Sequence, residues 1–107
     1  MKIYNFENVE YALGQTSQEN WVMLTVENPK HYFFHLSSFP SGYCSLRHLN
    51  PTDEMIRTAA NFCKHGSKHK NAKNLYVDYC KFSNLIKGEK EGEVIFKSNR
   101  QVDRIKT

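Results

Sequence analysis

The sequence predicts an α+β domain whose sheet is mostly antiparallel, with one main amphipathic helix and one shorter helix. Short runs rich in aromatic and β-branched residues lie on both sides of one clear helical repeat, and turn-forming residues separate them. The length of 107 residues suits one domain, so we expect residues 1–107 to form a single small domain. Hydrophobic residues make up 39% of the chain, which is enough for a folded core.

The first half of the chain predicts two strand pairs and a short helix. Residues 2–6 alternate as KIYNF, which favours a strand, and residues 11–14 supply its partner. Asn20 is a good N-cap for a short helix that extends to Val26. The aromatic run 31–36 and the run 43–47 are separated by serine, proline and glycine, which predicts a hairpin with a longer loop.

Residues 52–65 carry the clearest helical pattern. Asn50 or Thr52 can cap the helix, and apolar side chains recur at helical spacing at Ile56, Ala59, Ala60 and Cys63. Lys64 and His65 suit the negative end of the helix dipole, and Gly66 is the expected stop.

The second half predicts three further strands. Residues 75–80 are rich in strand formers and should make a central strand. Residues 83–93 indicate a charged turn region. The segments 94–97 and 101–106 then predict a closing hairpin around Ser98 and Asn99.

The charge balance favours an anionic partner. The net charge is +4 and the isoelectric point is about 9.0. The segment KHGSKHKNAK, residues 64–73, holds four lysines and no acid, and it follows the predicted helix as a loop. Such a loop can bind phosphates by releasing counterions, or it can be a solvated loop. The candidate contacts in it are Lys64, Lys68, Lys70, Asn71 and Lys73.

Five further residues are candidates for the same surface. His35 lies in an aromatic strand, where a histidine is either part of the packing or a contact to a base or phosphate. Arg47 ends a predicted strand and can donate a guanidinium fork to a phosphate. Lys97, Arg100 and Arg104 add positive charge near the end of the chain, as does Lys106, which is not itself one of the five candidates.

The sequence gives little support to an enzyme or a metal protein. Cys44, Cys63 and Cys80 are an odd number without paired spacing, and no leader segment precedes them, which favours the reducing cytoplasm. Cys63, His65 and His69 lack a fourth zinc ligand. No nucleophile elbow, phosphate loop or membrane-length apolar run is present, so we expect no catalysis, cofactor, metal or membrane segment. The remaining alternative is a metal-dependent or Cys/His enzyme.

Several motifs, in order, resemble the NFACT-R domain of fibronectin-binding-protein-A-like proteins and of the ribosome quality-control factors that tail stalled nascent chains. Gly14 and Asn20 match a glycine and a late asparagine of that family, and Arg47 matches the arginine that ends a strand. His35 keeps the last residue of an aspartate, tryptophan and histidine signature, whereas Tyr43 replaces a histidine. The loop 64–73 and the strand after it also match. In length the chain is most similar to the family's stand-alone, small coiled-coil-domain branch.

The resemblance implies nucleic-acid binding, chiefly to RNA such as tRNA or ribosomal RNA in translation or ribosome-associated quality control. DNA binding is the variant implied by the small coiled-coil branch. The resemblance implies neither a hydrolase nor a bound metal. The alternative from another class is a protein-interaction module that docks on the ribosome or on a translation factor.

Overall fold

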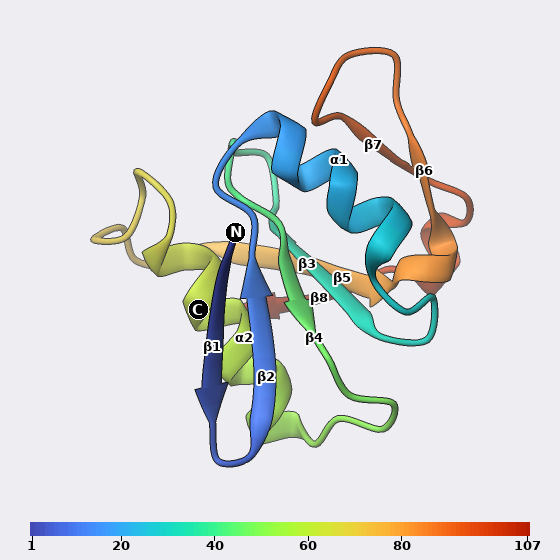
Figure 1. Cartoon of the computed structure of the whole chain (residues 1–107). Coiled ribbons are helices and arrows are strands. Elements are labelled where there is room, and N and C mark those ends of the chain that lie inside the picture. The colour runs from blue at the N-terminus through green and yellow to red at the C-terminus, as the bar shows by residue number, and fades with distance from the viewer.

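The computed structural model describes residues 1–107 and consists of a six-stranded antiparallel sheet with a helix on each face (Figure 1). The strand order is β1-β2-β4-β3-β5-β8, and β6 and β7 form a separate hairpin. This confirms the predicted α+β class. Neither helix is long and apolar enough to cross a membrane. The elements are β1 (Lys2–Phe6), β2 (Val9–Leu13), α1 (Ser17–Val26), β3 (Tyr32–Leu36), β4 (Cys44–Leu46), α2 (Asp53–His65), β5 (Tyr76–Lys81), β6 (Leu85–Lys87), β7 (Val94–Phe96) and β8 (Asp103–Lys106).

Both faces of the sheet are covered, because successive side chains of a strand point to opposite faces. Phe34 and Leu36 of β3 join the core beneath α2, whereas Phe33, the residue before Phe34, joins the core beneath α1. Figure 1 shows α1 and the β6–β7 hairpin side by side over one face, with α2 against the other. The strands β3 and β5 also run across the direction of β1 and β2, as expected of a strongly twisted sheet (Figure 1).

The two predicted strand pairs of the first half are confirmed. β1 pairs with β2 through a two-residue turn, in which Glu7 and Asn8 have φ values of 52° and 65°. Positive φ at both central residues is the geometry of a type I′ hairpin, whose twist matches that of the strands. β3 pairs with β4 through the longer loop that the serine, proline and glycine residues predict.

The first helix begins earlier than predicted, and Asn20 is not its cap. Thr16 caps α1 because its Oγ1 accepts a hydrogen bond from the Glu19 N–H at 3.1 Å. Asn20 lies one turn inside the helix, is buried, and accepts a hydrogen bond from the backbone N–H of Tyr43 at 3.1 Å. The side chain that resembles a cap therefore fastens α1 to the start of β4.

The main helix is confirmed at both ends. Thr52 accepts a hydrogen bond from the Met55 N–H at 3.2 Å, and Gly66 is the C-cap. Gly66 has a φ of −79°, which any residue can adopt. Glycine is needed here because a side chain would have no space. A Cβ at this position would lie 2.8 Å from Cδ2 of Leu13. The end of α2 is thus pressed against the sheet, and this contact sets the direction in which the next loop leaves.

The predicted closing hairpin is wrong, although the predicted strand at 75–80 is confirmed as β5 between β3 and β8. β7 pairs with β6, which lies in the predicted turn region, and β8 pairs with β5. Asn84 explains why β7 and β8 do not pair with each other. Its Nδ2 donates to the carbonyl of Ser98, and its Oδ1 accepts from the Ser98 N–H, each at 2.9 Å. This clamp ends β7, and a short helical turn then redirects the chain to β8.

Candidate nucleic-acid interface

The loop between α2 and β5 is held by its own turns. Ser67 is central, because its hydroxyl donates to the carbonyl of Lys64 at 2.7 Å and accepts from the His69 N–H at 3.1 Å. Near the end of the loop Asn74 has a left-handed φ of 60° and turns the chain into buried Leu75. The loop that the sequence predicts is therefore an ordered projection with fixed ends.

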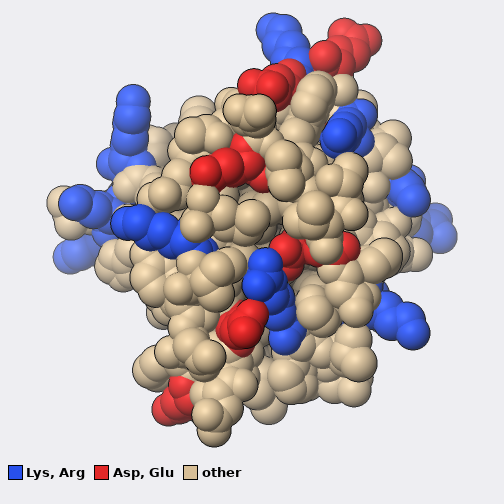
Figure 2. Space-filling model, viewed as in Figure 1, with Lys and Arg blue, Asp and Glu red and all other residues tan.

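The lysines of this loop are available to a ligand. Lys68, Lys70 and Lys73 are exposed, as is Asn71, and Lys64 is half-buried. Of the 15 lysines and arginines of the chain, only Arg47 and Arg104 pair with a carboxylate. Figure 2 shows basic side chains gathered on the left of the molecule, over the loop that follows α2. The structure therefore keeps the four lysines and Asn71 together on one loop.

Strand β8 adds one lysine that was not among the candidates. Lys106 stands opposite Tyr76 in the sheet, and the next residue, Thr107, donates its N–H to the carbonyl of Leu75 at 2.7 Å. The end of β8 is thus fastened beside the end of the loop. We define the basic surface as Lys64, Lys68, Lys70, Lys73 and Lys106. Lys106 is 33 residues from Lys73 in the sequence. Only the pairing of β8 with β5 shows that it belongs to the basic surface.

The other basic candidates lie elsewhere. Lys97 and Arg100 are exposed beyond β7, in the connection to β8. Arg104 lies in β8, where its Nε donates to Asp78 Oδ1 at 3.0 Å, and Asp78 in turn is the cross-strand neighbour of His35. Arg104 therefore pairs with a carboxylate that is next to His35 in the sheet, and its guanidinium lies 5.7 Å from the ring of Tyr76, the cross-strand partner of Lys106.

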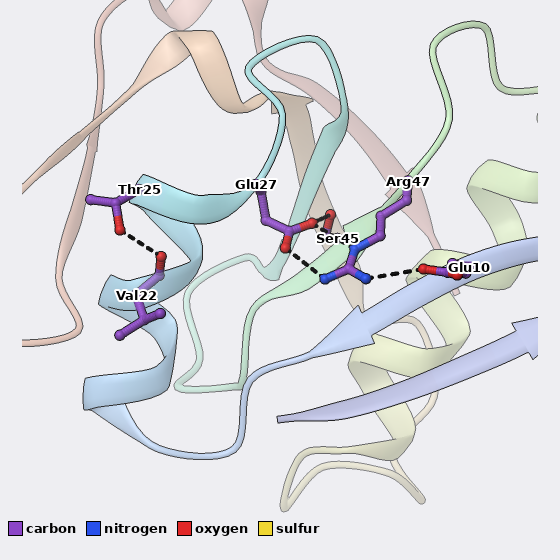
Figure 3. A network of polar contacts seen from close by, with 6 residues as sticks. All are labelled: Glu10, Val22, Thr25, Glu27, Ser45 and Arg47. Atoms are coloured by element: carbon purple, nitrogen blue, oxygen red, sulfur yellow. Dashed lines mark hydrogen bonds and ion pairs between the residues drawn. The ribbon is translucent and has the colours of Figure 1, made fainter.

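Arg47 is committed to two carboxylates (Figure 3). Its Nε and Nη2 donate to Glu27 at 3.0 and 2.8 Å, and its Nη1 donates to Glu10 at 3.0 Å. The Glu27 side chain is only 2% exposed and also accepts a hydrogen bond from Ser45 at 2.5 Å. A phosphate contact by Arg47 stays a prediction, but the guanidinium already serves to neutralise a buried acid, so we leave it outside the basic surface.

The Glu27 carboxylate is held in its charged form. Burial raises its pKa, but the hydrogen bonds from Arg47 and Ser45 outweigh burial, and the net pKa lies below the ordinary value of 4.5. This cluster is at the opposite end of β4 from Gly42, and hence from the α2 C-terminus. It contributes to the fold rather than to the basic surface.

His35 stands at the floor of a cleft between the β3–β4 loop and the β6–β7 hairpin. Its ring lies parallel to Phe33, with 6.3 Å between centroids, and edge-on to Tyr43 at 5.5 Å. Burial lowers the pKa of His35, and the Leu36 backbone and the Asp78 carboxylate offset this only in part. The imidazole is therefore neutral at pH 7 and offers one donor and one acceptor.

The zinc hypothesis has no geometry to support it. Cys63 is buried in the core beneath α2, with its sulfur 3.6 Å from the Ser41 hydroxyl, whereas His65 is exposed. No three His, Cys, Asp or Glu side chains are placed to hold a metal ion. All three cysteines are free and buried, and burial raises the pKa of Cys63 and Cys80 to about 11. None of the three is activated as a nucleophile.

Comparisons with known proteins place the fold. No family model matches the chain, and no curated protein matches it. Among solved structures, the chain is similar to the C-terminal part of the fibronectin/fibrinogen-binding protein from Streptococcus suis, with a TM-score of 0.88 and 20% sequence identity. The match covers 98% of this chain and 43% of that one. The whole domain therefore has the fold found in the C-terminal part of that protein.

Proposed function

We propose that this domain binds nucleic acid, in the first place RNA, through the basic surface. The observation that carries the proposal is the set of lysines on the α2–β5 loop, none of which pairs with a carboxylate. An unpaired lysine has no ion pair to break when it meets a phosphate, and it releases cations that were condensed on the nucleic acid, so binding gains entropy. Lysine cations hold the phosphate backbone without reading base edges, so selectivity from this surface alone should be low.

Two observations support an NFACT-R-like RNA-binding role over a general affinity for polyanions. The family-like motifs occur in order along the chain, and the fold is that of the C-terminal part of a fibronectin/fibrinogen-binding protein. The RNA that the resemblance implies is tRNA or ribosomal RNA, in translation or ribosome-associated quality control, with DNA as the variant ligand. In this role the protein is a binding module and not an enzyme.

A protein-interaction module is the second candidate. Edge strand β1 leaves one side of its backbone unpaired and carries Ile3 and Phe6, which are 49% and 46% exposed. An exposed edge with apolar side chains is the usual place for an added strand of a partner. The name of the similar Streptococcus suis protein also states that it binds the proteins fibronectin and fibrinogen. For this chain the partner would be a ribosomal protein or a translation factor.

Replacing Lys68 and Lys70 by alanine in the full chain should weaken binding to every nucleic acid and flatten its salt dependence. Each phosphate contact with a single strand contributes about 0.7 to the slope of log K against log salt. The double variant should therefore lower the slope by about 1.4. The measurement is a fluorescence anisotropy titration of a hairpin RNA, a single-stranded RNA and a duplex DNA at several salt concentrations.

The matched control is the double replacement of Lys30 and Lys90, two exposed lysines outside the basic surface. It removes the same charge, so it should leave the slope close to that of the unchanged protein. Equal effects of the two double variants would show that net charge, and not the loop, holds the ligand. The absence of binding to all three nucleic acids at low salt would favour the protein-interaction module.

A further inference from the structure

A cleft of about 400 Å³ lies beside the basic surface, between the β3–β4 loop and the β6–β7 hairpin. The β3–β4 loop contributes Phe39 and Pro40 to its lining, and β7 contributes Val94 and Phe96. Phe39 is 40% exposed, so part of its ring is open to a ligand. The volume is within the range of small-molecule pockets and leaves room for a bicyclic aromatic ring.

Two carboxylate side chains line the cleft, together with the polar side chains of His35, Ser38 and Tyr43. Asp78 lines it, and its Oδ1 accepts from Ser37 at 2.7 Å and from Arg104 at 3.0 Å, while Oδ2 accepts no hydrogen bond. Glu93 lines it as well, and its Oε1 accepts from the Glu89 N–H at 3.1 Å while Oε2 is without a donor. Two carboxylate oxygens therefore remain for a ligand that brings N–H donors.

The cleft is continuous with the lysine loop. The Phe39 ring lies 4.5 Å from the ring of His69, which belongs to that loop between Lys68 and Lys70. A strand whose phosphates contact these lysines therefore passes the mouth of the cleft. Single-stranded nucleic acids commonly bind in this way, with the backbone on cations and a base stacked on an aromatic ring.

We propose that this cleft accepts one unpaired base of the bound strand and prefers guanine, an inference that rests on the proposed function. Guanine is the one standard base whose pairing edge offers two adjacent donors, the N1–H and the exocyclic amino group, which match a carboxylate. Adenine and cytosine offer one amino group beside an acceptor nitrogen, and uracil offers one N–H between two carbonyls. The base stacks on Phe39 and donates hydrogen bonds to Asp78 or Glu93. The basic surface then binds the phosphates, and the cleft recognises the base.

The test compares oligouridylates that carry a single central guanosine, inosine or adenosine. Inosine lacks only the exocyclic amino group, so it isolates the second donor. The full chain should bind the guanosine strand about tenfold more tightly than the other two, within the range measured for a bidentate contact to a base. All three strands should lose affinity equally in the Lys68→Ala, Lys70→Ala double variant.

Variants then locate the preference. Glu93→Gln should reduce the ratio of guanosine to inosine affinity, whereas Glu91→Gln, an exposed neighbour that removes the same charge, should leave the ratio unchanged. Phe39→Ala should lower affinity for the guanosine strand, whereas Phe6→Ala, a similarly exposed phenylalanine on β1, should not. Both test positions are in exposed segments, so each variant is expected to fold, and a circular dichroism spectrum verifies this.

Three outcomes would overturn the inference in distinguishable ways. Equal affinity for the three strands, with the lysine-dependent salt slope intact, removes the cleft as a base site and leaves the proposed function standing. Failure of all three strands to bind removes both. Displacement of the guanosine strand by an arginine amide, with no guanosine preference in its absence, would assign the cleft to a basic side chain of a protein partner instead.

Discussion

Replacing Glu27 by alanine is expected to cost about 3 kcal/mol of unfolding free energy. The carboxylate is 2% exposed and receives three hydrogen bonds, two from Arg47 and one from Ser45 (Figure 3). Its removal leaves the buried Ser45 hydroxyl without its acceptor and Arg47 with Glu10 alone. The cost is at the lower end of the range for broken buried pairs because Arg47, 27% exposed, can regain water. Urea unfolding followed by circular dichroism measures it.

Glu10→Ala is the matched control, because Glu10 binds the same guanidinium but is not buried. Its side chain is 50% exposed, so its ion pair with Arg47 should contribute less than about 1 kcal/mol. The double variant Glu27→Ala with Arg47→Ala should cost less than the sum of the single changes, since the two side chains interact directly. Similar small losses for Glu27→Ala and Glu10→Ala would contradict the assignment of Glu27 as the centre of the cluster.

The same cluster makes the protein sensitive to acid. The folded pKa of Glu27 is below its ordinary value of 4.5, so the unfolded chain takes up a proton first as the pH falls. The stabilisation is complete above about pH 4.5 and declines as the pH drops through the folded pKa. Glu27→Gln should therefore show a shallower loss of stability between neutral and acidic pH. Parallel acid profiles for the two proteins would show that other carboxylates carry the effect.

Gly42→Ala is the second large change, and we expect it to cost about 3 kcal/mol. A Cβ on Gly42 would overlap the backbone carbonyl oxygen of Gly14, and Leu13 lies just beyond it. Gly14 is itself hydrogen-bonded to Tyr43 at 2.9 Å, so the two segments cannot separate without breaking the β2–β4 end of the sheet. Thermal unfolding would report the cost as a lowered midpoint.

Gly88→Ala is the control for this substitution. The three atoms nearest to the added methyl group belong to the side chain of Glu93, an exposed glutamate that can move by giving up its hydrogen bond from the Glu89 N–H. Its effect on stability should therefore be within about 1 kcal/mol. A comparable loss at Gly88 and Gly42 would mean that the overlap with Gly14 is relieved by a movement that the structure does not indicate.

The parts of the fold that the sequence predicted are those determined by local chemistry. The helix over 52–65 has a cap, an apolar face and a terminal glycine within one segment, and α2 matches it closely. The strands over 2–6 and 31–36 have aromatic and β-branched runs bounded by turn residues. The closing hairpin failed because nothing local reveals that Asn84 clamps Ser98, a contact across 14 residues.

The candidate site divides in the same way. The lysine loop was predictable because its four lysines lie within ten residues of sequence and the helix before them ends clearly. The role of Arg47 was not, because its carboxylate partners are 20 and 37 residues away. Lys106 and the cleft lining likewise come together only through strand pairing and through the packing of the β6–β7 hairpin.

The most direct test of the central claim is a titration of the isotope-labelled full chain with a short single-stranded RNA, followed by proton–nitrogen correlation NMR. We expect the largest shift changes on the amides of residues 64–73 and of Lys106, with those near Glu27 and Arg47 almost unmoved. Shift changes concentrated on β1, or around Arg47 with the lysine loop unaffected, would contradict it.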